Sequence, residues 1–247
     1  MVAKKLHNLY EMQNKFTILC SRPLTEALIN EAKEKGITIE ELSFIETTPI
    51  NTTPVKTEIE NIAKQNTTVA FTSMNAVEAV ADVLKDQQIN WSIYCIGTTT
   101  VQLVEKYFGH QHIAGTANSA AELAQLIATD KSIKKVDFFC GDQRRDELPD
   151  ILRSNEIEVN ELVIYTTSTV PHTIDKMYDG ILFFSPSGVH SFFENNTLPA
   201  STILFAIGST TGNEIVKYTS NKIVLSNIPG KENLVRKMIE YFTESSA

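Results

Sequence analysis

Phe183-Phe184-Ser185-Pro186-Ser187-Gly188-Val189 is an apolar run that stops at a turn of small, hydroxyl-bearing residues. The pattern predicts a buried strand that leads into the N-terminus of a helix. Phe71-Thr72-Ser73-Met74-Asn75-Ala76-Val77 has the same plan, and each copy is followed by a matched turn, Ile96-Gly97-Thr98-Thr99-Thr100 or Ile207-Gly208-Ser209-Thr210-Thr211. From Phe71 to Gly97 is 26 positions (97 − 71), and from Phe183 to Gly208 is 25 (208 − 183). Two matched pairs at matched spacing predict two similar α/β units.

Apolar strands alternate with amphipathic helices along most of the chain. Residues 181–184, for example, precede a segment that places Val189, Phe192 and Phe193 on one helical face. The strands are continuously apolar, which is typical of parallel sheets covered by helices on both faces. The sequence therefore predicts an α/β protein made of two doubly wound, flavodoxin-like parallel-sheet domains.

Two polar stretches rich in threonine and proline interrupt this pattern. Residues 47–54 read Thr-Thr-Pro-Ile-Asn-Thr-Thr-Pro, and residues 166–173 read Thr-Thr-Ser-Thr-Val-Pro-His-Thr. Such stretches mark breaks between structural segments. If both are crossings between domains, residues 47–165 form a domain inserted into an outer domain of residues 1–46 and 166–247.

Other segments carry more local expectations. Residues 37–45 have alternating apolar positions and predict a strand, and residues 57–65 predict a short helix. We expect Gly141–Arg145 to connect the strand before it to a helix. Residues 1–14 are polar and weakly patterned, which predicts a loose extension.

Length and charge limit the classes of protein to which the chain can belong. A chain of 247 residues is long enough for two domains of ordinary size. Its net charge of −8, from 22 basic and 30 acidic residues, argues against a general nucleic-acid-binding protein, which needs a basic surface to meet phosphates. An anionic small ligand is still compatible, because backbone N–H groups at helix ends bind anions without side-chain charge.

The sequence also bears on the compartment. It contains neither the apolar core of a signal peptide near its N-terminus nor a run of membrane-spanning length, so we expect a cytoplasmic protein without a membrane partner. Cys20, Cys95 and Cys140 lie far apart in apolar runs, outside any Cys-x-x-Cys pattern. We therefore expect buried, reduced thiols.

Hydroxyl residues gather at one edge of the predicted sheets. In doubly wound folds, ligands bind beyond the carboxyl ends of the strands, and Ser73, Thr98–Thr100, Ser185–Ser187 and Ser209–Thr211 all fall there. Each turn could simply cap its helix, because serine and threonine are common N-caps. As a set, however, two domains that offer such turns to a shared cleft suit a ligand with many carboxylates, since helix N-termini carry partial positive charge.

Familiar catalytic motifs are missing. The sequence has no Gly-x-Gly-x-x-Gly, phosphate-loop or Gly-x-Ser-x-Gly motif, and the spacing of its five histidines predicts no metal site. Arg144 and Arg145 are expected at a helix start, where the dipole disfavours cations, so they either face an anion or are simply solvated. Tyr165 ends an apolar run at the second crossing, and its phenol either points at the cleft or packs in the linker.

At these residues the sequence resembles the uroporphyrinogen-III synthase family. Phe183–Val189 and Ala206–Thr211 resemble the family's Phe-Ser-Pro-Ser-Gly and Ala-Ile-Gly-x-Thr-Thr signatures. Phe71–Val77 and Ile96–Thr100 resemble the counterparts of these signatures in the first half of the family's sequences.

The middle of the chain fits the family as well. Phe139–Pro149 resembles the family's middle segment, and Tyr165–Thr167 follows in the family's order. The resemblance thus runs from about Phe16 to Phe242. It implies two α/β domains joined by a two-stranded connector, with one domain inserted in the other, and it favours a monomer.

The resemblance also implies an activity, the closure of linear hydroxymethylbilane to uroporphyrinogen III in tetrapyrrole (haem) biosynthesis. Water is lost and the last pyrrole ring is inverted, through a cation and then a spiro intermediate, without cofactor or metal. The substrate is a floppy polycarboxylate whose uncatalysed closure gives the wrong isomer, so the protein's task is largely to hold one folded conformation. Backbone amides and hydroxyls would bind its acetate and propionate groups. A transient contact with the preceding enzyme of the pathway is a further expectation.

Site residues follow from the resemblance position by position. Tyr165 matches the tyrosine proposed to assist loss of the hydroxyl group. Asn75 stands where some members carry arginine, and since the substrate is acidic we expect the cleft to be locally neutral or positive. The substrate-binding residues expected on this basis are Ser73, Thr100, Ser185, Ser187, Gly188, Thr211 and Arg145.

Two other interpretations are weighed against the synthase. A non-catalytic sensor or regulator would use the same two-domain cleft to bind an anionic metabolite. The sequence separates it poorly from an enzyme that has no diagnostic nucleophile. A nucleotide-dependent transferase is disfavoured by the missing phosphate loop.

Overall fold

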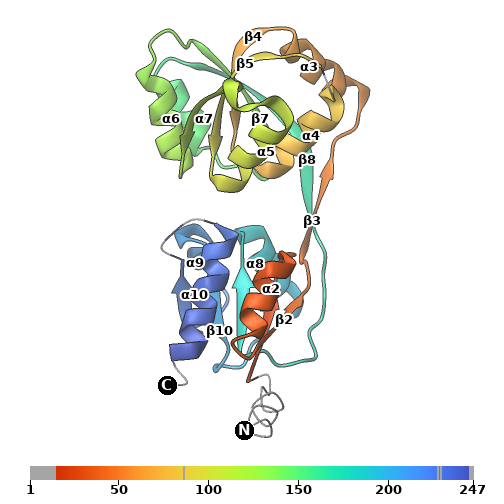
Figure 1. Ribbon diagram of the computed structural model, residues 1–247, viewed down its shortest axis with the longest axis vertical. Helices are drawn as coiled ribbons and strands as arrows, with labels where there is room; N and C mark the ends of the chain where they lie inside the picture. Colours follow the sequence, from red (N-terminus) through yellow and green to blue (C-terminus); the bar gives the residue numbers. More distant parts are fainter. Residues whose placement is uncertain (1–14, 86, 227, 229, 245–247) are drawn as a thin grey trace, which may run out of the picture. The chain divides into compact units, whose positions relative to one another are not determined.

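The structure is a computed structural model that describes residues 15–85, 87–226, 228 and 230–244. The chain forms two compact units (Figure 1). Unit 1 combines the chain up to Glu46 with the chain from Thr169 onward, and unit 2 is Thr47–Ser168. The extension expected at residues 1–14 lies outside the described residues. No helix in the described ranges is long and apolar enough to span a membrane.

Unit 1 is built on a five-stranded sheet in which every pair of neighbours is parallel. The order across the sheet is β2-β1-β9-β10-β11, which is 2-1-3-4-5 when its strands are numbered along the chain. This is the flavodoxin-like order. The strands are β1 (Phe16–Cys20), β2 (Ile37–Glu41), β9 (Gly180–Phe183), β10 (Ile203–Ala206) and β11 (Ile223–Leu225).

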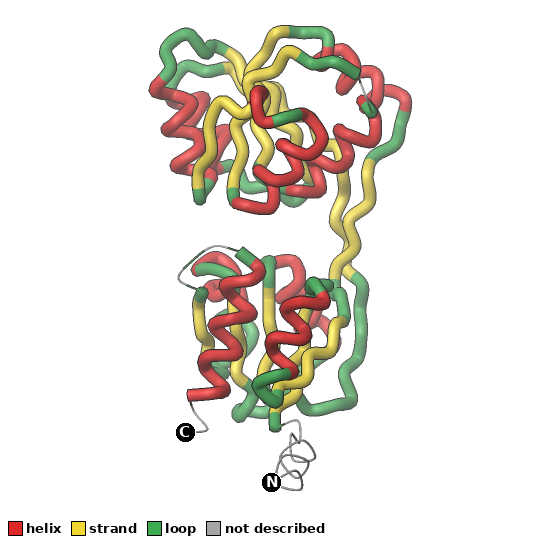
Figure 2. Tube along the Cα trace, in the orientation of Figure 1, coloured by secondary structure: helices red, strands yellow, loops and turns green. Residues whose placement is uncertain are grey.

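Helices cover both faces of this sheet (Figure 2). They are α2 (Glu26–Lys33), α8 (Pro186–Asn195), α9 (Ser209–Ile215) and α10 (Lys231–Glu244). Ile18 of β1 packs in a cluster with residues of α2 and α10, and its neighbour Leu19 packs in a second cluster with residues of α8 and α9. Successive residues of one strand are therefore buried on opposite faces, which explains why the strands are continuously apolar.

Unit 2 contains a six-stranded sheet in the order β3-β8-β7-β4-β5-β6. The five strands from β4 to β8 pair with one another in parallel. Numbered along the chain these five run 3-2-1-4-5 across the sheet, which becomes 2-1-3-4-5 when the count starts at β7. The strands are β3 (Ile45–Pro49), β4 (Asn66–Phe71), β5 (Asn90–Ile96), β6 (Ile113–Ala117), β7 (Lys135–Gly141) and β8 (Glu158–Thr169).

Unit 2 is also covered on both faces. Its helices are α3 (Thr53–Ala63), α4 (Met74–Leu84), α5 (Thr98–Phe108), α6 (Ala120–Thr129) and α7 (Glu147–Ser154), with a 3₁₀ turn at His110–His112. Residues of α3, α4 and α5 share one core cluster with Phe71 and Phe139, and residues of α6 and α7 share another with Ala70 and Phe138. The predicted α/β fold with doubly covered sheets is confirmed in both units, and the sheets are parallel apart from β3.

The strands β3 and β8 carry the chain from one unit to the other. The hydrogen bonds Ile50 N–H to Ile164 O (2.8 Å) and Val170 N–H to Phe44 O (2.9 Å) show that the two strands run antiparallel. The boundaries Glu46/Thr47 and Ser168/Thr169 fall within them. The threonine-rich stretches are therefore strands rather than loops at these points, which suits their β-branched side chains.

Two local predictions were wrong in their bounds. Residues 37–45 form two strands, because the chain leaves β2 after Glu41 and resumes in β3 at Ile45, where it pairs with β8. The helix expected at 57–65 begins at Thr53, because Pro54 fits the first turn of a helix, where no N–H bond is required.

A buried carboxylate ties three strands of unit 2 together. Asp137 of β7 has no exposed surface. It accepts hydrogen bonds from Thr67 Oγ1 of β4 (2.7 Å) and Asn160 Nδ2 of β8 (2.7 Å), and Lys135 Nζ lies 3.5 Å away. A buried charge is tolerated when it is satisfied in this way. The cluster faces the opposite end of the strands from the turns described next.

Candidate functional site

Four strand-to-helix turns lie at the carboxyl ends of neighbouring central strands. In unit 2 they join β4 to α4 at Ser73 and β5 to α5 at Gly97, and in unit 1 they join β9 to α8 at Ser185 and β10 to α9 at Gly208. Strands β4 and β5 pair in parallel, as do β9 and β10, so the two turns of each unit share one sheet edge. The sequence placed these turns at that edge, and the structure confirms it.

Serine caps the helix at the first turn of each pair. Ser73 Oγ accepts a hydrogen bond from Asn75 N–H (3.2 Å), and Ser185 Oγ accepts one from Gly188 N–H (3.1 Å). Ser187 Oγ lies 3.3 Å from Ser185 Oγ, so the second hydroxyl also belongs to this turn. These serines satisfy one of the amides that a helix leaves unpaired at its N-terminus.

Glycine opens the helix at the second turn of each pair. Gly97 and Gly208 make no side-chain cap, and the first bond within α5 is Val101 N–H to Gly97 O (3.1 Å). The amides of the first turn of α5 therefore have no carbonyl in their own helix. A Cβ built on either glycine would meet no atom within 4 Å, so a ligand can approach the backbone closely.

Thr100 and Thr211 are buried, in contrast to the residues just before them. Thr100 is 6% exposed and Thr211 is 2% exposed, whereas Thr98, Thr99 and Ser209 are exposed. The rotation of the helix turns the third residue of each first turn toward the core. Of the residues expected to bind substrate, these two can contribute backbone atoms more readily than side chains.

Tyr165 of β8 lies against the first turn of α4. Its hydroxyl donates a hydrogen bond to Ser73 Oγ (3.0 Å), so Ser73 accepts from both Tyr165 and Asn75. The backbone of the tyrosine is held by Asp142 N–H, which donates to Tyr165 O (3.1 Å). A Cβ on Gly141 would come within 2.5 Å of Tyr165 Cε2, so only glycine lets the ring lie there. The phenol is thus placed by tertiary contacts at a helix N-terminus.

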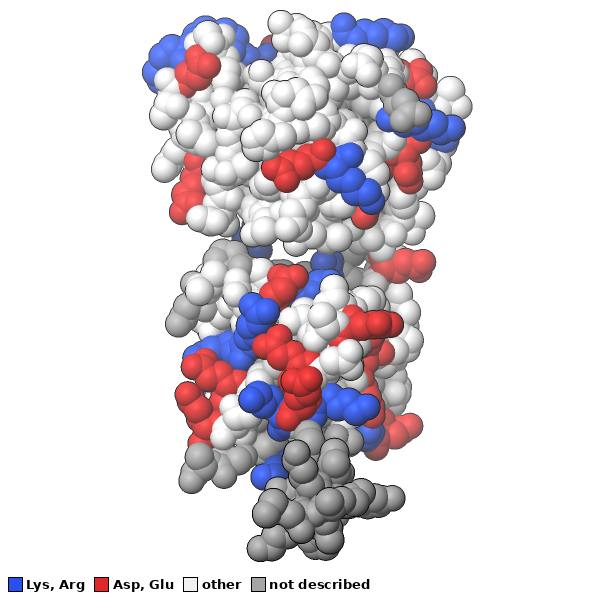
Figure 3. Space-filling model, in the orientation of Figure 1, with Lys and Arg blue, Asp and Glu red and all other residues white. Residues whose placement is uncertain are grey.

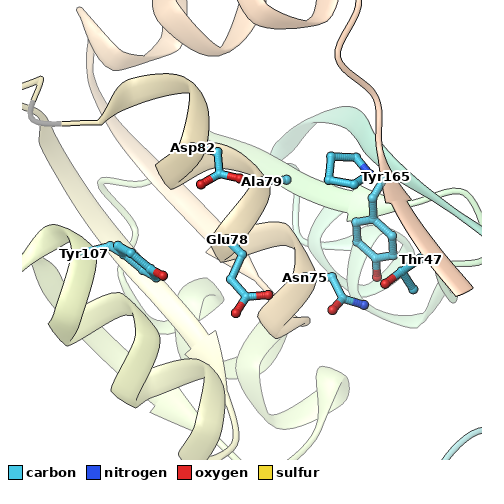
Figure 4. A pocket seen from close by; sticks show the side chains of 8 residues that line it. Thr47, Asn75, Glu78, Ala79, Asp82, Tyr107 and Tyr165 are labelled. Carbon is cyan, nitrogen blue, oxygen red and sulfur yellow. The ribbon is translucent and has the colours of Figure 1, made fainter. Parts of the chain in front are cut away.

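A cavity of about 320 Å³ lies next to this tyrosine, within unit 2 (Figure 4). Helix α4 supplies one side of the cavity, α5 supplies Tyr107, and β8 supplies Tyr165. Figure 4 shows the Asn75 and Glu78 side chains between the two tyrosines in this view. The lining residues are Thr47, Pro49, Asn75, Glu78, Ala79, Asp82, Tyr107 and Tyr165.

Sequence reasoning missed the acidic side of this cavity. Asn75, Glu78 and Asp82 lie at positions i, i+3 and i+7 of α4, so they form one polar stripe, and this spacing was the available signal. Two carboxylates therefore make this side of the unit 2 cavity acidic. On the face drawn in Figure 3, acidic and basic side chains are intermingled on unit 1, whereas the part of unit 2 drawn there is mostly uncharged.

The two arginines do not open a helix. Helix α7 begins at Glu147 after an N-cap at Asp146, so Arg144 and Arg145 lie in the turn before it and the expected position was wrong. Arg144 forms ion pairs with Asp146 and Glu161, and the hydrogen bond that it donates to Asp146 raises the pKa of its guanidinium. Arg145 is exposed. The acidic residues in the first turn of α7 suit the helix dipole.

The cysteines have the buried positions that the sequence predicts. All three thiols are free and buried. Desolvation raises the pKa of Cys20 to about 12 and the pKa values of Cys95 and Cys140 to about 11, so the thiols stay protonated at neutral pH. Protonated thiols are poor nucleophiles. Within the described residues, no group of three or more His, Cys, Asp or Glu side chains could hold a metal ion.

Sequence comparison finds similarity to uroporphyrinogen-III synthases. The family model for uroporphyrinogen-III synthase HemD matches residues 26–236. The uroporphyrinogen-III synthase of Schizosaccharomyces pombe is 24% identical over 215 residues, which cover 78% of this chain and 83% of that protein. The uroporphyrinogen-III synthase of Saccharomyces cerevisiae is 27% identical over 195 residues, covering 65% of this chain and 69% of that protein.

Solved structures show the same relationship at the level of the fold. The crystal structure of uroporphyrinogen-III synthetase from Helicobacter pylori has a TM-score of 0.63 at 17% identity and covers 92% of this chain and 99% of its own. A mutant uroporphyrinogen III synthase from Thermus thermophilus has a TM-score of 0.62 at 13% identity and covers 94% and 100%.

Proposed function

Since the chain belongs to the uroporphyrinogen-III synthase family, we propose that it closes linear hydroxymethylbilane to uroporphyrinogen III, with loss of water and inversion of the last pyrrole ring. The reaction makes it a cyclising lyase of tetrapyrrole biosynthesis. The observation that supports this most is the hydrogen bond from Tyr165 to Ser73 beside the unit 2 cavity. It places a proton donor, the Tyr165 hydroxyl, next to a helix N-terminus and to a cavity of about 320 Å³.

Tyr165 is the proposed catalytic residue. The hydroxymethyl C–O bond breaks with its electron pair on oxygen, and the oxygen takes up the phenol proton, so that water leaves. The cation formed is attacked by the last ring to give the spiro intermediate. For this step the Tyr165 proton must turn from Ser73 to the substrate, which the short, neutral contact between the two hydroxyls allows.

The carboxylates of the substrate bind at the helix N-termini of both units. In unit 2 we assign this role to Ser73 and to the backbone at Thr100, and in unit 1 to Ser185, Ser187 and the backbone at Thr211. These turns combine open backbone with the positive end of helix dipoles. Gly188 and Arg145 complete the proposed set, and a substrate carboxylate would compete with Ser185 Oγ for the Gly188 N–H.

The setting follows from the same chemistry. Free, buried thiols are typical of a reducing compartment, so we propose that the protein works in the cytoplasm, as a monomer. Because hydroxymethylbilane closes on its own to the wrong isomer, transient contact with the enzyme that makes it would shorten the time it spends in water.

Turnover separates the enzyme from a sensor that only binds the same anion. The protein is mixed with a roughly 100-fold molar excess of freshly made hydroxymethylbilane, so that its consumption requires many turnovers, and substrate loss is followed over time. The proposal predicts complete consumption at a rate proportional to protein concentration. Consumption at the spontaneous rate, with substrate merely bound, would favour the sensor.

A further inference from the structure

Helix α4 presents one polar stripe to the cavity beside Tyr165. Asn75, Glu78 and Asp82 line the cavity from successive turns, while Val77 and Val80 on the other side of the helix are fully buried. The stripe places a carboxylate one turn beyond the Ser73 cap that holds the phenol. The polar side chains of this stripe are not needed for folding, because α4 packs against the core through its apolar side.

The Glu78 carboxylate has no partner in the part of the chain that the structure describes. It is half-buried, and neither a hydrogen bond nor an ion pair holds it. Asp82 lies four residues further along the helix, where a like charge is unfavourable. The residues that line the cavity include neither lysine nor arginine, and the exposed Lys106, next to the lining residue Tyr107, donates to Tyr107 Oη (3.3 Å). The cavity therefore carries an uncompensated negative charge.

Such a charge is unexpected beside a site for a polycarboxylate, because it repels the acetate and propionate groups. It is favourable only for the parts of the substrate that donate hydrogen bonds or carry positive charge, namely the pyrrole N–H groups and the cation formed after C–O cleavage. Carboxylates would then bind at the helix N-termini and the reacting pyrrole in the cavity. The negative charge thus separates the place where the substrate carboxylates bind from the place where the reacting pyrrole binds.

On the basis of the proposed function, we propose that Glu78 is a second catalytic residue. Its carboxylate accepts a hydrogen bond from the N–H of the reacting pyrrole and stabilises the cation. When the C–O bond breaks, the nitrogen lone pair is donated through the ring to the electron-deficient carbon, and the N–H group becomes positively charged. The hydrogen bond to Glu78 is then charge-assisted on both sides and strengthens in the transition state. An interaction that is stronger in the transition state than in the bound substrate raises kcat.

The step balances without any further reagent. The bonding electrons of the C–O bond leave with oxygen, and Tyr165 lends the proton that completes water. In the spiro intermediate the original bond between the last ring and its neighbour breaks, its electrons stay in the last ring, and the free α-carbon of that ring forms the final bond. This carbon gives up its proton when the pyrrole becomes aromatic again, and the proton restores the phenol. Glu78 stays ionised throughout and exchanges no proton.

The test compares Glu78→Gln with Glu60→Gln and Glu78→Asp. Glu60→Gln is the matched control, because it removes one exposed charge from α3 of the same unit, outside the cavity lining. We expect Glu78→Gln to lower kcat on the order of 10- to 100-fold, with KM unchanged or lower because repulsion of the substrate carboxylates is reduced. Glu78→Asp should recover part of kcat, and Glu60→Gln should stay within about twofold of wild type. Melting temperatures check that all variants fold.

The outcomes separate this proposal from the proposed function. Wild-type kcat in Glu78→Gln, or equal losses in Glu78→Gln and Glu78→Asp, would overturn the role of the Glu78 charge. Equal losses in Glu78→Gln and Glu60→Gln would overturn its assignment to this residue. A wild-type protein that forms no type III isomer above the spontaneous background would instead contradict the proposed function itself.

Discussion

Tyr165 and Gly141 lie on neighbouring strands and depend on each other. The register of β7 and β8 shifts by one residue between Cys140 and Gly141, so Gly141 lies opposite Tyr165. The absent side chain of the glycine leaves room for the ring, and Ser73 then receives the hydroxyl. A phenol fixed in this way loses little entropy when substrate binds.

Removing the phenol hydroxyl tests its part in the chemistry. We expect Tyr165→Phe to slow turnover several-fold without loss of folding, because the ring keeps its packing while the proton donor is lost. Steady-state kinetics and a thermal melt provide the measurement. The control is Tyr107→Phe, at the other wall of the cavity. An unchanged rate in Tyr165→Phe would remove Tyr165 from the mechanism.

Displacing the ring tests its placement. We expect Gly141→Ala to lower kcat more than Tyr165→Phe does, because the added methyl would lie within 2.5 Å of Tyr165 Cε2 and the ring must move. The same clash should cost about 1–3 kcal/mol of unfolding free energy. Gly208→Ala is the stability control, since a Cβ there meets no atom within 4 Å. Equal unfolding free energies for the two alanine variants would contradict the close approach.

At the scale of elements, strand-to-helix turns could be predicted from the sequence because their signals are local. An apolar run followed by serine and a helical stripe specifies β4–Ser73–α4 and β9–Ser185–α8 without reference to the rest of the chain. The break between β2 and β3 could not be predicted in this way. Its cause is the pairing of β3 with β8, more than one hundred positions away in sequence.

The start of α7 was misplaced for a related reason. Arg144 is held outside the helix by Asp146 and by Glu161 of β8, and the second of these partners is not visible locally. The burial of Thr100 and Thr211 was missed because it depends on the rotation of a helix about its axis, which the first turn alone does not determine. The polar stripe of α4 was visible but has the ordinary appearance of a solvated face.

The Asp137 cluster makes a prediction about the central strands of unit 2. We expect Asp137→Ala to lower the unfolding free energy by about 2–4 kcal/mol, because Thr67 and Asn160 lose a charged acceptor in the interior. Asp137→Asn keeps one acceptor oxygen and should lose less. Urea unfolding provides the measurement. A loss below about 1 kcal/mol for Asp137→Ala would show that the network contributes little.

At the scale of the whole molecule, the two units have the same spatial order of strands, but the chain begins this order at a different strand in each unit. Strands β4 and β5 of unit 2 occupy the places that β9 and β10 occupy in unit 1, which explains the matched spacing of the turns. The repeat could be predicted from the sequence. The flavodoxin-like strand order was also expected. That unit 2 begins this order at its third strand could not be predicted, because it is decided by which strands pair in the folded protein.

This duplication predicts that product contacts both units. Titration with uroporphyrinogen III should shift the amide resonances of Ser73 and of Ser185–Ser187 together, at the same product concentrations, because we propose that both turns bind carboxylates of one molecule. Amides beside Asp137, at the other end of the strands, serve as the control. Shifts limited to one unit would contradict a substrate held by both.

The isomer composition of the product is the measurement that tests the central claim most directly. The protein is incubated with hydroxymethylbilane, the products are oxidised, and the type I and type III isomers are separated. We predict that type III dominates and that its share rises with protein concentration, since spontaneous closure gives type I. Type I alone, formed at the rate seen without protein, would contradict the assignment of this chain as a functioning synthase.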